Sequence, residues 1–141
     1  MLAKSIGLAA TVLTLSSLGF SVLGSTPLLI LRHDVPMDGR FIRQVFHYCY
    51  RVVAVFAITA TIAHAASERI GLAVGLGAIA LLALVMHQWL LHRLDALRLT
   101  MYEGGGDPLG IRRFRQLHAG AIGLNFVQLV AMIAGLTQVT L

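Results

Sequence analysis

The side chains best suited to chemistry in this chain are histidines, set at intervals along stretches that are otherwise apolar. There are six histidines among 141 residues. Neutral imidazole is a common ligand for transition metals and for haem iron. Two histidines at the same level on facing helices would hold a haem, and His47 could pair in this way with His92 or with His118. These three residues are the candidates for a ligand or metal site.

The spacing of the histidines does not add a metal-binding motif of its own. Neither an HxxxH nor an ExxH pattern occurs, and Cys49, the single cysteine, excludes a CxxC motif and an intrachain disulfide. A metal site also needs several converging ligands held by a second shell of hydrogen bonds. We therefore predict no cofactor, and keep haem or metal binding as an alternative.

A second group of polar side chains suits a structural role. An unpaired amide or hydroxyl in hydrocarbon costs several kcal/mol, so such groups hydrogen-bond between helices. His118 and Asn125 lie about two turns apart on one helical face, and Asn125 lies deep enough to require a partner on another helix. No residue is assigned a catalytic role. The predicted structural, interhelical polar residues are His118, Asn125, Arg51, Tyr50 and Thr61.

Composition indicates the elements that must position these side chains. Hydrophobic residues make up 57% of the chain and charged residues 12%, about half of the usual charged share. A membrane-spanning helix needs about 20 mostly apolar residues. Four windows meet this requirement, at about residues 5–31, 41–66, 70–99 and 112–139. With short connections, they predict an all-α integral membrane four-helix bundle of antiparallel, up-down connectivity, forming one domain over residues 1–141.

Helical periodicity predicts which faces point into the bundle. Steps of three and four residues place side chains on one face of a helix. On the second helix this face is Arg43, His47, Tyr50, Ala54, Ala57, Thr61 and His64. On the fourth helix it is Arg115, His118, Ile122, Asn125, Leu129 and Met132. On the third helix, Gln88, His92 and Asp95 share a face, and His87 is expected to turn away from it.

The positive charges predict an orientation. Nine of the eleven lysines and arginines fall on the side of the two longer connections, and only Lys4 and Arg69 fall on the other side. Lys and Arg favour the cytoplasmic side of a membrane. We therefore expect both termini to be non-cytoplasmic, most simply in a bacterial inner membrane. The charges serve as topology signals, so nucleic acid is not an expected partner.

Short motifs near both ends of the chain resemble those of one family. Arg113-Phe114-Arg115-Gln116-Leu117-His118, followed by Asn125, resembles the start of the last helix in the transmembrane protein 205-like family. Thr26-Pro27-Leu28-Leu29 resembles the close of its first helix, and Gly39 with Val45-Phe46 and Tyr48/Tyr50 resembles the entry to its second. The resemblance implies a four-helix membrane domain of unknown function and supplies no catalytic residue. The chain departs from it in the short turn after the second helix and in His47, His64 and His87.

These observations favour a protein that acts by interaction and not by catalysis. We predict an accessory subunit of a larger membrane complex, or a small homo-oligomer, with membrane lipid and other membrane subunits or itself as partners. One alternative is a histidine-based haem- or metal-binding redox protein. Another is a small transporter, although Asp95 and Glu68 lie near helix ends and transport usually needs an ionisable group near the midplane.

Overall fold

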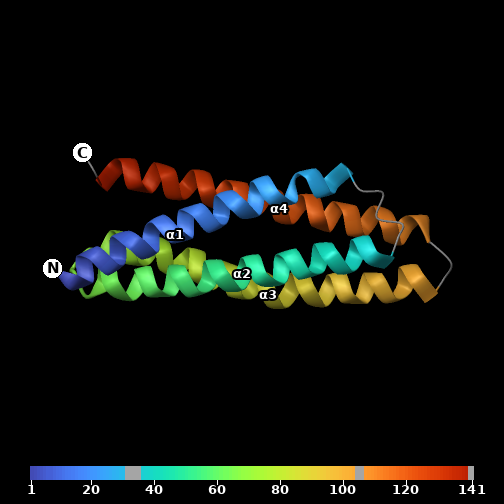
Figure 1. Ribbon diagram of the computed structural model, residues 1–141, viewed down its shortest axis with the longest axis horizontal. Helices are drawn as coiled ribbons and strands as arrows, with labels where there is room; N and C mark the ends of the chain where they lie inside the picture. Colours follow the sequence, from blue (N-terminus) through green and yellow to red (C-terminus); the bar gives the residue numbers. More distant parts are fainter. Residues whose placement is uncertain (31–35, 104–106, 140–141) are drawn as a thin grey trace.

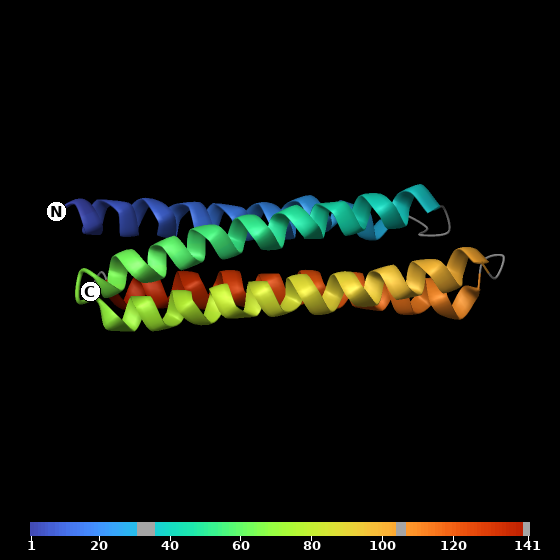
Figure 2. The same ribbon diagram turned by 90° about the horizontal axis from the view of Figure 1, so that it is seen from below.

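The structure, a computed structural model, describes residues 1–30, 36–103 and 107–139, and helices account for nearly all of them. The helices are α1 (Leu2–Ser25), a short 3₁₀ helix η1 (Pro27–Ile30), α2 (Pro36–Ala65), α3 (Ile70–Glu103) and α4 (Pro108–Val139). Figures 1 and 2 show the four long helices side by side, each antiparallel to the next along the chain. The prediction of an all-α four-helix bundle is confirmed.

Each long helix is long and apolar enough to cross a membrane. The candidate spans are Leu2–Ile30, Met37–Ala65, Ile70–Leu99 and Pro108–Thr137. Large apolar side chains on their outer faces are exposed, including Phe20, Val74 and Phe126. Exposed apolar side chains of this kind are favourable in contact with lipid, because the hydrocarbon around them is equally apolar. The chain is therefore an integral membrane protein.

The helix ends differ from the predicted bounds by a few residues. α2 begins at Pro36 and α4 at Pro108, each about one turn earlier than expected. Proline is favoured at the first helical position because its missing N–H would be unpaired there anyway and its φ already suits a helix. Asp107 caps α4, accepting hydrogen bonds from the backbone N–H groups of Leu109 and Gly110 at 3.0 and 3.1 Å. α3 continues to Glu103, about one turn past the predicted end.

The predicted tight turn between the second and third helices is present, and it has a defined geometry. The N–H of Arg69 donates to the carbonyl of His64, and the N–H of Glu68 donates to the carbonyl of Ala65. This pair of bonds is the Schellman arrangement that ends many helices. Glu68 has a φ of 61°, in the left-handed region that usually favours glycine. The turn fixes α2 and α3 as close antiparallel neighbours.

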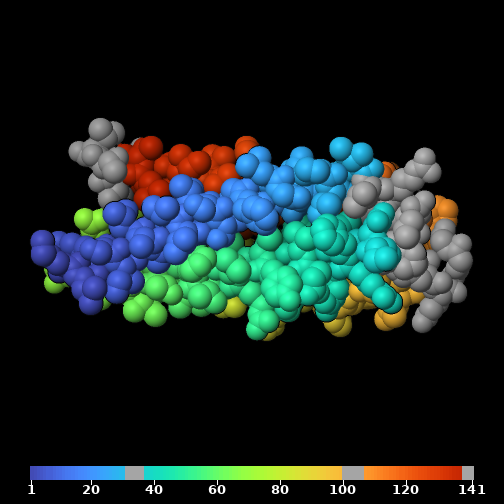
Figure 3. Space-filling view, viewed as in Figure 1, coloured from blue at the N-terminus to red at the C-terminus, as the bar shows by residue number. Residues whose placement is uncertain are grey.

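The core lies along α2, which packs against both α1 and α3 over most of its length. Its inner face is made of small and aromatic side chains, and Phe46, Val53, Ala57 and Ala60 are almost fully buried. Figure 3 shows α1, α2 and the C-terminal half of α4 side by side on one face of an elongated molecule. Both termini lie at one end of the bundle, together with the α2–α3 turn (Figure 1).

Candidate functional site

The deepest polar contact in the bundle joins α4 to α1. Asn125 Nδ2 donates a hydrogen bond of 2.8 Å to Ser21 Oγ. Gln128, one turn further along α4, donates from Nε2 to Asn125 Oδ1 at 3.4 Å. The three side chains are buried. Asn125 therefore faces the interior and pairs with another helix, as predicted, whereas Ser21 and Gln128 were not foreseen.

A row of aromatic rings leads from the Asn125–Ser21 contact toward the N-terminal end of α4. The Phe46 ring stacks on Tyr50, with centroids 5.8 Å apart, and meets the edge of His118 at 5.5 Å. All three side chains are buried. The Tyr50 hydroxyl lies beside Asn125, outside hydrogen-bonding geometry with any described residue. The predicted inward orientation of His118 is confirmed, and Phe46 is a neighbour of its ring that the sequence did not indicate.

A second buried contact lies nearer the termini and joins α1 to α2. Thr11 Oγ1 donates to the Gly7 carbonyl at 2.7 Å and lies 2.9 Å from Nε2 of His64. Since the single hydroxyl proton is directed to Gly7, the Nε2–H of His64 is the donor of the second bond. A Cβ added to Gly7 would lie 3.1 Å from the His64 ring, so glycine permits this approach. The sequence placed His64 on the inner face of α2 but gave no partner.

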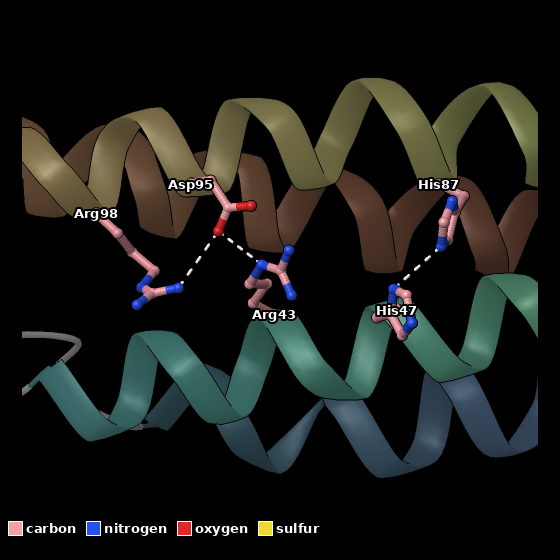
Figure 4. Close-up of polar contacts among 5 residues, drawn as sticks. All are labelled: Arg43, His47, His87, Asp95 and Arg98. Atoms are coloured by element: carbon pink, nitrogen blue, oxygen red, sulfur yellow. Dashed lines mark hydrogen bonds and ion pairs between the residues drawn. The ribbon is translucent and has the colours of Figure 1, made fainter.

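Charged and aromatic side chains pair along the outer edge of the α2–α3 contact (Figure 4). Asp95 lies between Arg43 of α2 and Arg98 of its own helix, at 2.6 and 3.3 Å. His87 Nε2 lies 3.1 Å from His47 Nδ1. The predicted face of α3 is therefore wrong in one respect, because His87 turns toward α2. The apolar residues of α3 surround the helix and did not define its inner face.

The three candidate ligands contact different neighbours. His47 pairs with His87, His92 is exposed on α3, and His118 is buried against Phe46. Within residues 1–30, 36–103 and 107–139, no group of three or more His, Cys, Asp or Glu side chains converges as a metal site would require. Binding of a haem or metal by His47, His92 or His118 was an alternative to the prediction of no cofactor, and neither is tested by these contacts.

Two predicted interhelical residues bond within their own helix. Thr61 Oγ1 donates to the Ala57 carbonyl at 2.7 Å, and its methyl group lies 3.5 Å from where a Cβ on Gly77 of α3 would be. Arg51 is exposed and approaches His47 at 3.3 Å, one turn away on α2. Thr61 thus contributes to the α2–α3 contact through its methyl group, and Arg51 belongs to the outer edge of the bundle.

The polar contacts in the interior hold the helices against one another. Two separate sets of buried polar side chains join α1 to α4 and α1 to α2, while the ion pairs lie on the outer edge. Hydrogen bonds between helices in lipid contribute about 0.6–2 kcal/mol each to association. The arrangement therefore fixes the register of the helices against one another.

Comparison of the chain with protein-family models, with curated proteins and with solved structures finds no match. The resemblance to the transmembrane protein 205-like family therefore remains a prediction that rests on the short motifs at the first, second and fourth helices.

Proposed function

We propose that the protein is a non-catalytic membrane protein that acts by binding other membrane-embedded chains. It serves either as an accessory subunit of a larger complex or as a small homo-oligomer. The observation that carries this proposal is on the outer face of α4. Gly120 and Gly123 are exposed, and a Cβ added to either would meet no atom within 4 Å. We call these two glycines, with the exposed Ala119 beside them, the α4 outer face.

Small residues on the lipid-facing side of a helix favour contact with another helix. Hydrocarbon is as apolar as a leucine side chain, so helices in a membrane associate mainly through close packing and hydrogen bonds. Glycine and alanine at the contact let two backbones approach closely. On the α4 outer face, apart from the adjacent backbone of α4, none of the described residues lies within 4 Å of the Cβ position of either glycine, which favours a helix of another chain as their neighbour.

The buried polar residues support the non-catalytic part of the proposal. Asn125 bonds to Ser21 and Gln128, and Thr11 bonds to His64 and Gly7. Groups engaged in this way position helices and are not free to act on a substrate. The proposal therefore places the activity on the outside of the bundle.

The charge distribution supports a location and an orientation. Among the described residues, the half of the bundle opposite the termini holds Arg40, Arg43, Arg93, Arg98, Arg112, Arg113 and Arg115, while Arg51 lies at the middle of α2. The end with the termini holds Lys4 and Arg69. Arg32, counted in the sequence, lies outside the described residues. By the positive-inside rule we propose non-cytoplasmic termini and a bacterial inner membrane.

Photo-crosslinking in native membranes tests the proposal. A photoreactive amino acid at Ala119 should capture another protein chain, because it lies beside Gly120 and Gly123. The matched control is the same amino acid at Val55, which is exposed on the outer face of α2 among large side chains. Capture of lipid alone at both positions would contradict the proposal.

A further inference from the structure

The outer surface of the bundle carries a positive charge at the middle of α2. Arg51 is 14 positions from both Met37 and Ala65, the ends of its candidate span. Each of these distances is about 21 Å along the helix. The hydrocarbon core extends about 15 Å from the midplane, so Arg51 lies within it. Its side chain is exposed. A charged side chain at this depth is costly and almost always pairs with another group.

The described neighbours of this charge are two half-buried histidines. Nη1 of Arg51 lies 3.3 Å from Nε2 of His47, one turn earlier on α2. Nδ1 of His47 lies 3.1 Å from Nε2 of His87, as Figure 4 shows. His87 lies within one turn of the middle of the span Ile70–Leu99. We call Arg51, His47 and His87 the Arg51 cluster. It lies on the outer edge of the α2–α3 contact.

The direction of the hydrogen bonds shows which group the cluster lacks. Arginine carries donors only, so Nε2 of His47 accepts and the proton of His47 lies on Nδ1. That proton is donated to Nε2 of His87, which leaves the proton of His87 on Nδ1. The groups that remain are the other N–H groups of Arg51 and the Nδ1–H of His87, and all of them are donors. Neutral histidines also leave the charge of Arg51 uncompensated. The cluster therefore lacks an anionic acceptor.

The acidic residues of this chain do not supply that acceptor. Within residues 1–30, 36–103 and 107–139, Arg51 forms no ion pair. Asp95 lies eight positions from His87, about 12 Å along α3. It is already paired with Arg43 and Arg98 (Figure 4). The other described acidic residues lie near or beyond the ends of the long helices, and they are Asp38, Glu68, Glu103 and Asp107. Asp34 precedes α2 in the sequence, outside the described residues.

These positions restrict the occupant of the outer edge. A second copy of the chain in the same orientation would bring no described carboxylate to the level of Arg51. A lipid phosphate lies at the membrane boundary, above the hydrocarbon core. Charged side chains in spanning helices almost always face protein or a water-filled cavity. Since Arg51 points away from its own bundle, the complementary group is a carboxylate on a helix of another protein.

We propose that the outer edge of α2 and α3 binds a membrane-spanning helix of a different protein, which carries an aspartate or glutamate within the hydrocarbon core. The carboxylate accepts hydrogen bonds from Arg51 and compensates its charge. The contact is centred at the level of His47, because the Arg51 side chain reaches back one turn toward it. Val55 lies eight positions from His47, about 12 Å nearer the termini, and we expect lipid beside it.

This inference rests on the proposed function, because its occupant is another membrane-embedded chain. It goes further in naming the chemistry of that chain. For this edge it favours the accessory subunit over the homo-oligomer. The α4 outer face is on a different helix, so each surface can be tested by itself.

A designed membrane-spanning peptide serves as the probe. It has about 20 leucine and alanine residues between flanking lysines, with one glutamate at its centre. Matched peptides carry glutamine at the centre, or glutamate near one end. Energy transfer from a fluorophore at the C-terminus of the full-length protein measures binding in phosphatidylcholine vesicles. We expect the central-glutamate peptide to bind about tenfold to a hundredfold more tightly than either matched peptide, the effect of one charge-assisted hydrogen bond.

Two variants complete the test. Arg51→Gln should bind the glutamate and glutamine peptides equally, because the charge that the carboxylate compensates is absent. Arg51 is exposed, so this variant should fold, and its helix content by circular dichroism checks that it does. Arg112→Gln removes the same charge from an exposed position near the start of α4 and should keep the wild-type preference.

Four results would overturn the proposal. Equal binding of the glutamate and glutamine peptides by the wild-type protein is the first. The second is loss of the preference in Arg112→Gln, which would show a general effect of surface charge. The third is loss of the preference in vesicles that contain phosphatidylglycerol, which would show that lipid phosphate occupies the cluster. The fourth is separation of labelled copies of the protein by Arg51→Gln, which would identify a second copy as the occupant.

The outcome also separates this inference from the proposed function. A clear preference for the central-glutamate peptide, with no protein captured at Ala119, would contradict only the proposed role of the α4 outer face. Protein capture at Ala119 without the peptide preference would contradict only the assignment of the Arg51 cluster.

Discussion

Asn125 of α4 and Ser21 of α1 are joined by a hydrogen bond of 2.8 Å although they are 104 positions apart in the chain. Asn125 also accepts a bond from Gln128. An amide at this depth must be paired, so one contact between the first and last helices fixes the register of both. Because it joins the first helix to the last, this contact completes the bundle.

Replacing Asn125 with leucine tests the contact. Asn125→Leu removes the partner of both Ser21 and Gln128, and we expect it to weaken helix association by about 0.6–2 kcal/mol. The free energy of unfolding in mixed micelles, titrated with a denaturing detergent, measures this change. Ser17→Ala is the control, because the Ser17 hydroxyl donates to the Leu13 carbonyl of its own helix. Equal stability of Asn125→Leu and wild type would show that the contact contributes nothing.

The close approach of α1 to α2 gives a second prediction. Gly7→Leu would force its side chain against the His64 ring, which lies 3.1 Å from the Cβ position, and would displace the ring from Thr11. We expect a loss of about 1–3 kcal/mol in unfolding free energy, the usual cost of overpacking. Gly19→Leu, on the same helix with no atom within 4 Å of its Cβ position, should leave stability unchanged. Equal stability of Gly7→Leu and Gly19→Leu would contradict this prediction.

The inner face of α2 gives a third prediction. Ala57 is fully buried on the inner face of the helix, so Ala57→Leu should overpack the core and lower the unfolding free energy by about 1–3 kcal/mol. Val55→Leu enlarges an exposed side chain on the same helix and is the matched control. If Ala57→Leu unfolds at the same detergent fraction as Val55→Leu, the assignment of this face is incorrect.

Orientation in the membrane is the fourth prediction. Both termini lie at one end of the bundle, so reporters at the two ends must lie on the same side of the membrane (Figure 1). The arginines at the opposite end predict that this side is non-cytoplasmic. A reporter fused after Leu141 should be active only outside the cytoplasm, and one inserted at 104–107 only inside. Cytoplasmic activity at Leu141 would reverse the orientation. Leu141 and residues 104–106 lie outside the described residues.

The sequence was most informative where a helix has one polar or small face. Tyr50, Ala54, Ala57 and His64 recur at helical spacing on α2, and the structure buries all four. The same reasoning placed His118 and Asn125 of α4 inside. Periodicity within a helix is a local property, so it can be read before the fold is known.

Contacts between helices were less accessible to sequence reasoning. The pairing of Thr11 with His64, or of Ser21 with Asn125, depends on how two helices cross, which no local pattern records. α3 is apolar on all sides, so its rotation could not be assigned. His87 was expected to turn away from the face of Gln88, His92 and Asp95. In the structure it contacts His47 of α2. In a membrane protein an apolar helix has no preferred side, because lipid and protein interior are equally apolar.

The mass of the purified protein in mild detergent tests the central claim most directly. If the α4 outer face binds another chain, native mass spectrometry of the wild-type protein should give a particle heavier than the 15.2 kDa single chain. Gly123→Leu should return the particle to one chain, because leucine blocks close approach at an open position, while Gly19→Leu should behave as wild type. A wild-type protein that is a single chain, or a Gly123→Leu variant with the wild-type mass, would contradict the account.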